Sequence, residues 1–210
     1  MGMLTKKQRE SLERATLDAM ENVHLAEEYL AGRGIDLEVA RSNGLGVVVE
    51  PAVGQEHMRG MLSIPYMTDS GPVNMNARCF QDHDCKELKH SKYMNWHGGG
   101  VNLYGVQSLN AAGDWIAIAE GEFDAMILNM CGIPAVGVPG AEKFEPFWKN
   151  IFEDFSRVYL FHDADKAGED MGKLYAAEVG AIRVRLPQGY DVNKFYLEFG
   201  QDALRGKIRK

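Results

Sequence analysis

Carboxylates follow three separate apolar segments in the second half of the chain. Glu120 ends one segment, Asp163 and Asp165 end another, and Asp191 follows a third. Asp124 comes shortly after Glu120. Carboxylates gathered in one cleft repel each other, which raises their pKa values unless cations neutralise them. Mg²⁺ or Mn²⁺ with oxygen ligands would do so, and a site of this kind handles phosphates.

Each acid taken alone has a simpler interpretation, because acids are common at helix N-caps and in first helical turns. Asp165 is a candidate N-cap of this kind, and Glu122 is interpreted as a residue that starts a helix. The spacing of Asp163 and Asp165 lets both carboxylates face the same way in extended backbone. The set as a whole favours a metal site formed by Glu120, Asp163 and Asp165.

The second half of the chain alternates between strand-like and helical patterns. We expect strands at residues 115–119, 135–138, 157–162 and 182–186, and helices at 122–130, 142–155, 167–179 and 192–199. This alternation predicts right-handed crossovers and a parallel sheet flanked by helices. Because ligands bind at the carboxyl ends of the strands in such a sheet, the acids would meet at one edge.

The first half has a different pattern. We expect helix over residues 5–31, in one or two pieces, and a short helix capped by Asp36. Strands at residues 46–50, 61–67 and 73–80 follow, the last two joined by a hairpin turn at residues 68–71. The fold class is therefore α+β with an antiparallel element in a smaller domain at residues 1–112, then α/β in a domain at residues 113–210.

Composition limits the classes of protein to which the chain can belong. With 23 Lys and Arg against 30 Asp and Glu, the formal net charge is -7, which argues against strong non-specific duplex binding. Bound metal ions would cancel part of that charge. Three cysteines are too few for a disulfide framework, and no apolar stretch is long enough to span a bilayer. We expect a cytoplasmic protein without a membrane segment.

Two cysteines and two histidines lie close together in the sequence, at Cys79, His83, Cys85 and His90. Thiolate and imidazole are zinc ligands, and four of them would close a tetrahedral structural site for Zn²⁺. The spacing C-x3-H-x-C-x4-H matches none of the common zinc patterns, however. It favours small hydrophobic cysteines and polar loop histidines over a zinc site.

The motifs resemble a known family when they are taken in order. Those of the second half are Glu120-Gly121-x-x-Asp124, Asp163-x-Asp165-x-Ala167-Gly168 and Leu186-Pro187-x-Gly189-x-Asp191. They resemble the Toprim domain, which is shared by bacterial-type primases, type IA and II topoisomerases and some nucleases. Those of the first half include Arg59-Gly60-Met61, Asn76-Ala77-Arg78, Lys92-Tyr93-Met94-Asn95 and Leu103-Tyr104-Gly105. This set resembles the RNA-polymerase domain of bacterial and phage primases, here without their zinc-binding and helicase-binding modules.

The resemblance implies synthesis of short RNA primers from ribonucleoside triphosphates on a single-stranded DNA template. It implies that Glu120 is a metal ligand or general base, that Asp163 and Asp165 are metal ligands, and that Asp124 and Asp191 support them. It assigns the nucleotide and template contacts to Arg59, Arg78, Lys92, Tyr93 and Asn95. It also implies a monomer, in the host cytoplasm if phage-encoded, with a replicative helicase and a zinc-ribbon module in trans as further partners.

Two alternatives stay open at this point. A Toprim nuclease would use the same acids to activate water, and a non-catalytic remnant of a primase would only bind the template. A nuclease has no need of the basic residues between Arg59 and Lys92, and a remnant has no need of an intact set of acids.

Overall fold

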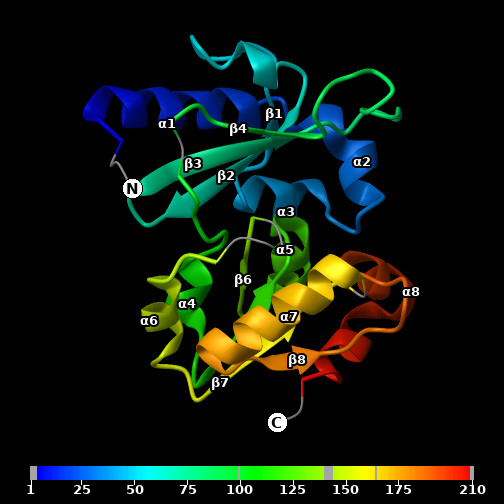
Figure 1. The fold of residues 1–210 in the computed structure, drawn as a ribbon. Helices are drawn as coiled ribbons and strands as arrows, with labels where there is room; N and C mark the ends of the chain where they lie inside the picture. Colours follow the sequence, from blue (N-terminus) through cyan, green and yellow to red (C-terminus); the bar gives the residue numbers. More distant parts are fainter. Residues whose placement is uncertain (1–3, 99, 140–143, 164, 209–210) are drawn as a thin grey trace. The chain divides into compact units, whose positions relative to one another are not determined.

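The computed structural model describes residues 4–98, 100–139, 144–163 and 165–208 (Figure 1). The chain forms two compact units, one ending at Gly100 and the other beginning at Val101. In the described part of the chain, no helix combines the length and the apolar character needed to cross a membrane.

The first unit consists of short helices and one antiparallel sheet. Its elements are α1 (Lys6–Met20), η1 (Val23–Ala26), α2 (Glu27–Ala31), α3 (Leu37–Ser42), β1 (Gly46–Val47), η2 (Glu56–Met58), β2 (Leu62–Thr68), β3 (Gly71–Arg78) and β4 (Tyr93–Asn95). The strand order is β1-β2-β3-β4, with every neighbouring pair antiparallel. Helix α1 packs along this sheet and buries Leu12 against Met75 and Ala77 of β3 (Figure 1).

Local sequence explains most of these boundaries. Thr5 and Gln8 form a capping box at the start of α1, and Asp36 caps α3 by accepting a hydrogen bond from Val39. The helix expected over residues 5–31 is broken into α1, η1 and α2. The predicted hairpin turn joins β2 to β3, but β4 was not predicted as a strand. It pairs with the end of β3, where Arg78 lies opposite Tyr93.

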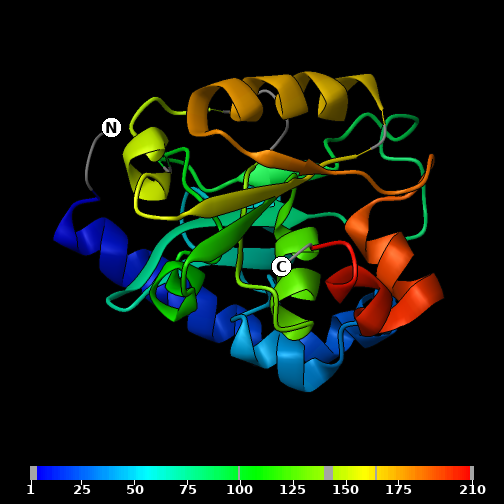
Figure 2. The same ribbon diagram turned by 90° about the horizontal axis from the view of Figure 1, so that it is seen from below.

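The second unit is built on a parallel sheet. Its elements are α4 (Gln107–Ala111), β5 (Trp115–Ala119), α5 (Glu122–Met130), β6 (Ala135–Gly137), α6 (Trp148–Phe152), β7 (Arg157–Phe161), α7 (Lys166–Val179), β8 (Ile182–Val184) and α8 (Val192–Arg205). The strand order is β6-β5-β7-β8, and all three pairings are parallel. Helices α7 and α5 lie on opposite faces of the sheet (Figure 2). The structure confirms the predicted fold class.

The core of this unit follows from the alternation of side chains along each strand. Ile116 and Ile118 of β5 belong to one apolar cluster, together with Trp148 of α6 and Tyr175 of α7. The alternate residues of β5, Ala117 and Ala119, point to the other face and are also fully buried. Both faces of the central strands are therefore covered, as a parallel sheet requires.

Three details differ from the expectations. Helix α6 covers only part of the helix expected at residues 142–155, and residues 142 and 143 lie outside the described part of the chain. Pro146 disfavours helical backbone at residue 145. The segment before β5 belongs to the second unit, because Tyr104 and Gly137 exchange two backbone hydrogen bonds. Helix α8 continues past the expected end at 199, but with a kink at Gly200, whose φ is 77°.

Candidate active site

Two neighbouring strands place acids side by side at the carboxyl edge of the second sheet. Strand β5 ends at Ala119, opposite Phe161 at the end of β7, so Glu120 and Asp163 both follow just beyond this pair. The Oε2 atom of Glu120 accepts a hydrogen bond of 2.9 Å from the backbone N–H of Asp163. This bond fixes the Glu120 carboxylate against the loop that leaves β7.

The electrostatics show that further acids lie near Asp163. Burial, followed by the charges of Glu120, Asp191 and Asp165 in that order, raises the pKa of Asp163 to about 6. Burial also raises the pKa of Glu120. The backbone hydrogen bond from Asp163 lowers this pKa and the charge of Asp165 raises it, and the net effect is a raised pKa. Four of the five predicted acids therefore lie close enough to repel one another.

Two of these acids also cap helices. Asp165 accepts a hydrogen bond of 2.8 Å from the N–H of Gly168 at the start of α7. Asp191 accepts one of 2.6 Å from the N–H of Lys194 at the start of α8. The capping interpretation of Asp165 is thus correct, but the cap uses only one carboxylate oxygen and leaves the other for a ligand.

The fifth acid, Asp124, has a supporting position. Its Oδ1 atom accepts a hydrogen bond of 3.2 Å from the backbone N–H of Asn193. Because Asp124 lies on α5 and Asn193 in the first turn of α8, this bond holds the two helices together. Asp191 therefore starts α8 at a defined place near Asp163. Glu122 is the first residue of α5 and is buried, as a helix-start residue.

Gly168 permits the close approach of α7 to the loop after β7. A Cβ atom at this position would lie 2.2 Å from the carbonyl oxygen of Asp163. No side chain fits there without moving the backbone of Asp163. The glycine of the motif Asp163-x-Asp165-x-Ala167-Gly168 is therefore a requirement of packing at the site.

A buried network behind Asp163 was not predicted from the sequence. His162 is 5% exposed, and its Nδ1 lies 2.9 Å from the carbonyl oxygen of Asp163. Its Nε2 accepts a hydrogen bond of 3.3 Å from Arg183 of β8, which also forms an ion pair with Glu169 of α7. The sequence offered one signal for this network: His162 directly follows a strand and directly precedes the candidate metal ligand Asp163.

The donor set fits a divalent cation of the hard kind. Glu120, Asp163, Asp165 and Asp191 offer carboxylate oxygens, and repulsion from the other three adds to burial in raising the pKa of Asp163. A bound Mg²⁺ or Mn²⁺ would remove that repulsion. Among the described residues, the carboxylate oxygens of these acids do not form a close ligand group like that of the cysteines and histidines at positions 79–90.

A groove in the first unit gathers three of the predicted nucleotide-binding residues. Arg78, Lys92 and Tyr93 line a cavity of about 870 Å³ together with Tyr29 and Phe80. The guanidinium of Arg78 lies over the Tyr93 ring, 4.9 Å from its centre, and donates a hydrogen bond to the Tyr93 hydroxyl. Tyr93 is 44% exposed, so its ring is available for stacking.

The other two predicted contact residues lie elsewhere in the first unit. Arg59 donates a hydrogen bond of 2.8 Å to the carbonyl oxygen of Val49 and forms an exposed ion pair with Glu50. Asn95 lies on β4 opposite Asn76, and its carbonyl oxygen contacts a His57 ring nitrogen at 3.0 Å. Neither residue lines the groove.

The fold is that of the RNA-polymerase domain of bacterial-type primases. The chain belongs to the family of phage and bacterial primase RNA-polymerase domains. The Gene 57 protein of Mycobacterium phage D29 is 35% identical over 151 residues, which cover 71% of this chain and 99% of that protein. The DNA primase of Aquifex aeolicus is 30% identical over 221 residues, or 87% of this chain and 44% of that protein.

Solved structures have the same fold. The crystal structure of the zinc-binding and RNA-polymerase domains of Aquifex aeolicus primase superposes with a TM-score of 0.80 at 23% identity, covering 97% of this chain and 61% of that one. The DnaG primase catalytic domain bound to single-stranded DNA gives 0.74 at 19% identity, covering 97% and 79%. No family model matches the chain. The match to the Aquifex aeolicus primase spans less than half the length of that protein.

Proposed function

We propose that this chain is the catalytic core of a DNA primase, which synthesises short RNA primers from ribonucleoside triphosphates on single-stranded DNA. The observation that carries the proposal is the crowding of carboxylates at the edge of the parallel sheet. Together with burial, which is the larger cause, this crowding raises the pKa of Asp163 to about 6. Perturbed acids at the carboxyl ends of parallel strands are typical of functional sites.

In this proposal Glu120, Asp163 and Asp165 of a Toprim domain hold Mg²⁺ or Mn²⁺. When bound, the ion supplies charge neutralisation for the triphosphate and aligns the attacking hydroxyl with the leaving pyrophosphate. Glu120 is held by the Asp163 N–H through one oxygen, and its raised pKa suits it to accept a proton from the primer hydroxyl. Asp124 and Asp191 keep α8 in place beside these residues.

The groove of the first unit supports template or nucleotide binding. Arg78 and Lys92 supply positive charge for phosphates, and the exposed Tyr93 ring supplies a stacking surface for a base. A primase catalytic domain with the same fold has been solved with single-stranded DNA, which supports DNA as the ligand. We do not assign Arg59 or Asn95 to this groove, because neither lines it.

The proposal is tested by incorporation of labelled ribonucleotides on a single-stranded DNA template with Mg²⁺ or Mn²⁺. A short RNA primer annealed to the template removes the need for initiation, and a zinc-ribbon module from a relative is added in a second arm. We expect extension by the wild type and a loss of about 100-fold or more in the Asp163→Ala and Glu120→Ala variants. Asp154→Asn is the matched control, since Asp154 is an exposed acid of the same unit outside the cluster.

Three outcomes distinguish the alternatives. Metal-dependent shortening of the template without incorporation identifies a nuclease. Template binding with neither reaction, in both arms, identifies a non-catalytic remnant. Extension that survives both acid substitutions contradicts the assignment of the site.

A further inference from the structure

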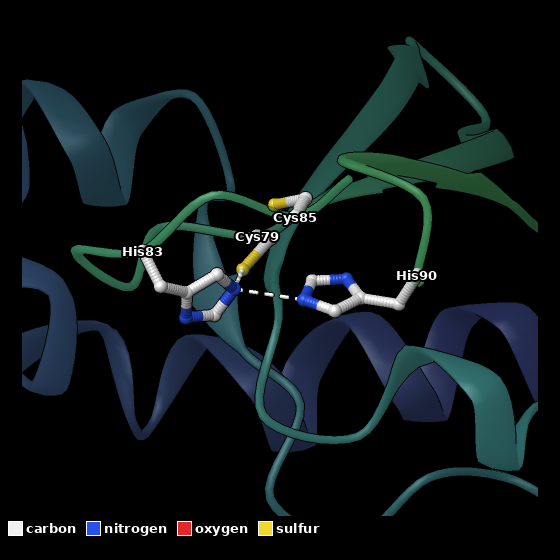
Figure 3. A group of neighbouring side chains, drawn as sticks. All are labelled: Cys79, His83, Cys85 and His90. Carbon is white, nitrogen blue, oxygen red and sulfur yellow. Dashed lines mark hydrogen bonds between the residues drawn. The ribbon is translucent and has the colours of Figure 1, made fainter. Parts of the chain in front are cut away.

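The loop that joins β3 to β4 brings four zinc-ligating side chains together. Cys79 follows β3 directly, and His83, Cys85 and His90 lie within the loop. One ligand atom from each residue lies within 4.8 Å of all the others. Figure 3 shows the two imidazole rings facing each other from opposite arms of the loop, with the Cys79 sulfur beside the nearer ring nitrogen of His83.

The distances are close to those of a tetrahedral zinc site. A tetrahedron with Zn–S of about 2.3 Å and Zn–N of about 2.0 Å has edges of about 3.3–3.8 Å. The Sγ of Cys79 lies 3.4 Å from the Nε2 of His83, and the two histidine Nε2 atoms lie 2.7 Å apart. A bound ion would open the histidine pair by about 0.6 Å and draw in the more distant ligand atoms, all of which already lie within 4.8 Å of one another.

The proton positions also suit metal binding. The Nδ1 of His90 lies 3.2 Å from the carbonyl oxygen of Ser91, which can only accept a hydrogen bond. In the tautomer with its proton on Nδ1, the His90 ring donates to this carbonyl and presents the lone pair of Nε2 to the cluster. Metal-binding histidines are oriented in this way by a backbone carbonyl behind them.

The two cysteines contact each other in the same cluster. The thiol of Cys85 donates a side-chain hydrogen bond to the sulfur of Cys79. Thiolates are soft ligands, so a site with two sulfurs and two imidazoles selects Zn²⁺ over the Mg²⁺ or Mn²⁺ that the carboxylates prefer.

The loop has no apolar core that would hold this conformation. Leu88 is 61% exposed, and among residues 81–91 none is buried. Lys89 has a positive φ of 55°, an unfavourable value for a residue with a side chain, and this turn returns the N–H of His90 to the carbonyl of Cys85. A bond between the Cys79 N–H and the Lys92 carbonyl closes the base of the loop.

We propose that Cys79, His83, Cys85 and His90 bind one structural Zn²⁺ ion, which fixes the β3–β4 loop. All four positions are filled by protein ligands, so the ion has no open site for catalysis. The spacing of the four residues did not predict a zinc site, because common zinc patterns present their ligands in closely spaced pairs. Here a turn at Lys89 returns His90 to the other three residues. The same loop lines the groove that contains Arg78, Lys92 and Tyr93.

The test measures metal binding by the purified full chain, without DNA or nucleotide, so it is independent of the proposed polymerase activity. Elemental analysis should find about one zinc per chain. Replacement by Co²⁺ should give the visible absorption of a tetrahedral cobalt–thiolate site. The Cys85→Ser and His90→Gln variants should bind zinc at least about tenfold more weakly. His24→Gln is the matched control, because His24 is exposed in the same unit and outside the cluster.

Limited proteolysis gives a second measurement on folded protein. Lys86 and Lys89 lie in the loop and are exposed, so trypsin should cut there faster after removal of zinc with a chelator, and zinc should restore protection in the wild type only. The proposal is overturned if the wild type takes up no zinc at saturating concentration under reducing conditions. It is also overturned if both ligand variants retain zinc like the wild type, or if the purified protein instead holds a Cys79–Cys85 disulfide.

Discussion

Replacing Asp163 with Asn should make the metal-free protein more stable, although it removes a carboxylate of the candidate active site. The folded-state pKa of Asp163 is about 6, against an ordinary value of 3.8. The difference of about 2 units corresponds to about 3 kcal/mol at 1.36 kcal/mol per unit. Because Asp163 is only half-buried, solvent screening reduces this to about 1–2 kcal/mol.

The sign follows from the direction of the shift. Between about pH 4 and pH 6 the folded protein binds more protons than the unfolded chain, so the free energy of unfolding falls as pH rises through this window. Above pH 6 the folded protein carries the full cost of the charge. An Asn side chain is neutral throughout this range. The free energy of unfolding of the variant should therefore exceed that of the wild type at pH 8 and differ little from it below pH 4. The bonds to Glu120 and His162 use the backbone of residue 163, so the variant keeps them.

Thermal unfolding at pH 8 with a chelator is the assay. A gain of 1–2 kcal/mol in a unit of this size corresponds to a rise in Tm of about 4–8 °C. Saturating Mn²⁺ should stabilise the wild type, by about 2.7 kcal/mol at 100 times its Kd, and the variant much less. Asp154→Asn should change neither quantity. A variant that is less stable than the wild type at pH 8 without metal would refute the argument that burial and neighbouring charges disfavour the Asp163 carboxylate. Equal stabilisation of both proteins by Mn²⁺ would refute its role as a metal ligand.

Three further predictions concern the surroundings of the two sites. Gly168→Ala should destabilise the protein by more than about 2 kcal/mol in denaturant unfolding, because the added Cβ would lie 2.2 Å from the Asp163 carbonyl oxygen. Gly113→Ala is the control and should be nearly neutral, because a Cβ there would have no atom within 4 Å. Equal effects of the two substitutions would contradict the packing argument. Tyr93→Ala should weaken single-stranded DNA binding by about 1–3 kcal/mol in fluorescence anisotropy, whereas Tyr93→Phe should keep most of the affinity; equal losses would argue against stacking. Arg183→Met should lower kcat for nucleotide incorporation with little change in KM, because it removes the hydrogen bond that orients His162 behind Asp163. An effect confined to KM would contradict this positioning role.

The parallel sheet and the placement of its acids could be predicted because both depend on local patterns. Alternating strands and helices specify the sheet, and Glu120 and Asp163 lie at its carboxyl edge because they directly follow β5 and β7. The capping role of Asp165 could also be predicted, because it directly precedes a helix, and Asp191 caps the next helix in the same way. The roles of all five acids stay predictions.

What the sequence did not reveal depends on contacts between distant residues. Strand β4 is short and exists because it pairs with the end of β3. The network of His162, Arg183 and Glu169 joins three elements that no local pattern relates. Cys79, His83, Cys85 and His90 come together through turns within a loop of uncommon spacing, and this spacing argued against a zinc site.

The most direct test of the central claim is whether incorporation follows the template. The wild-type chain, with a zinc-ribbon module and Mn²⁺, is given an RNA primer annealed beside a run of thymidines, and labelled ATP or UTP is supplied separately. The account predicts extension with ATP and not with UTP, and loss of extension in the Asp163→Ala variant but not in Asp154→Asn. Incorporation that ignores the template, or that is unchanged by Asp163→Ala, would contradict it.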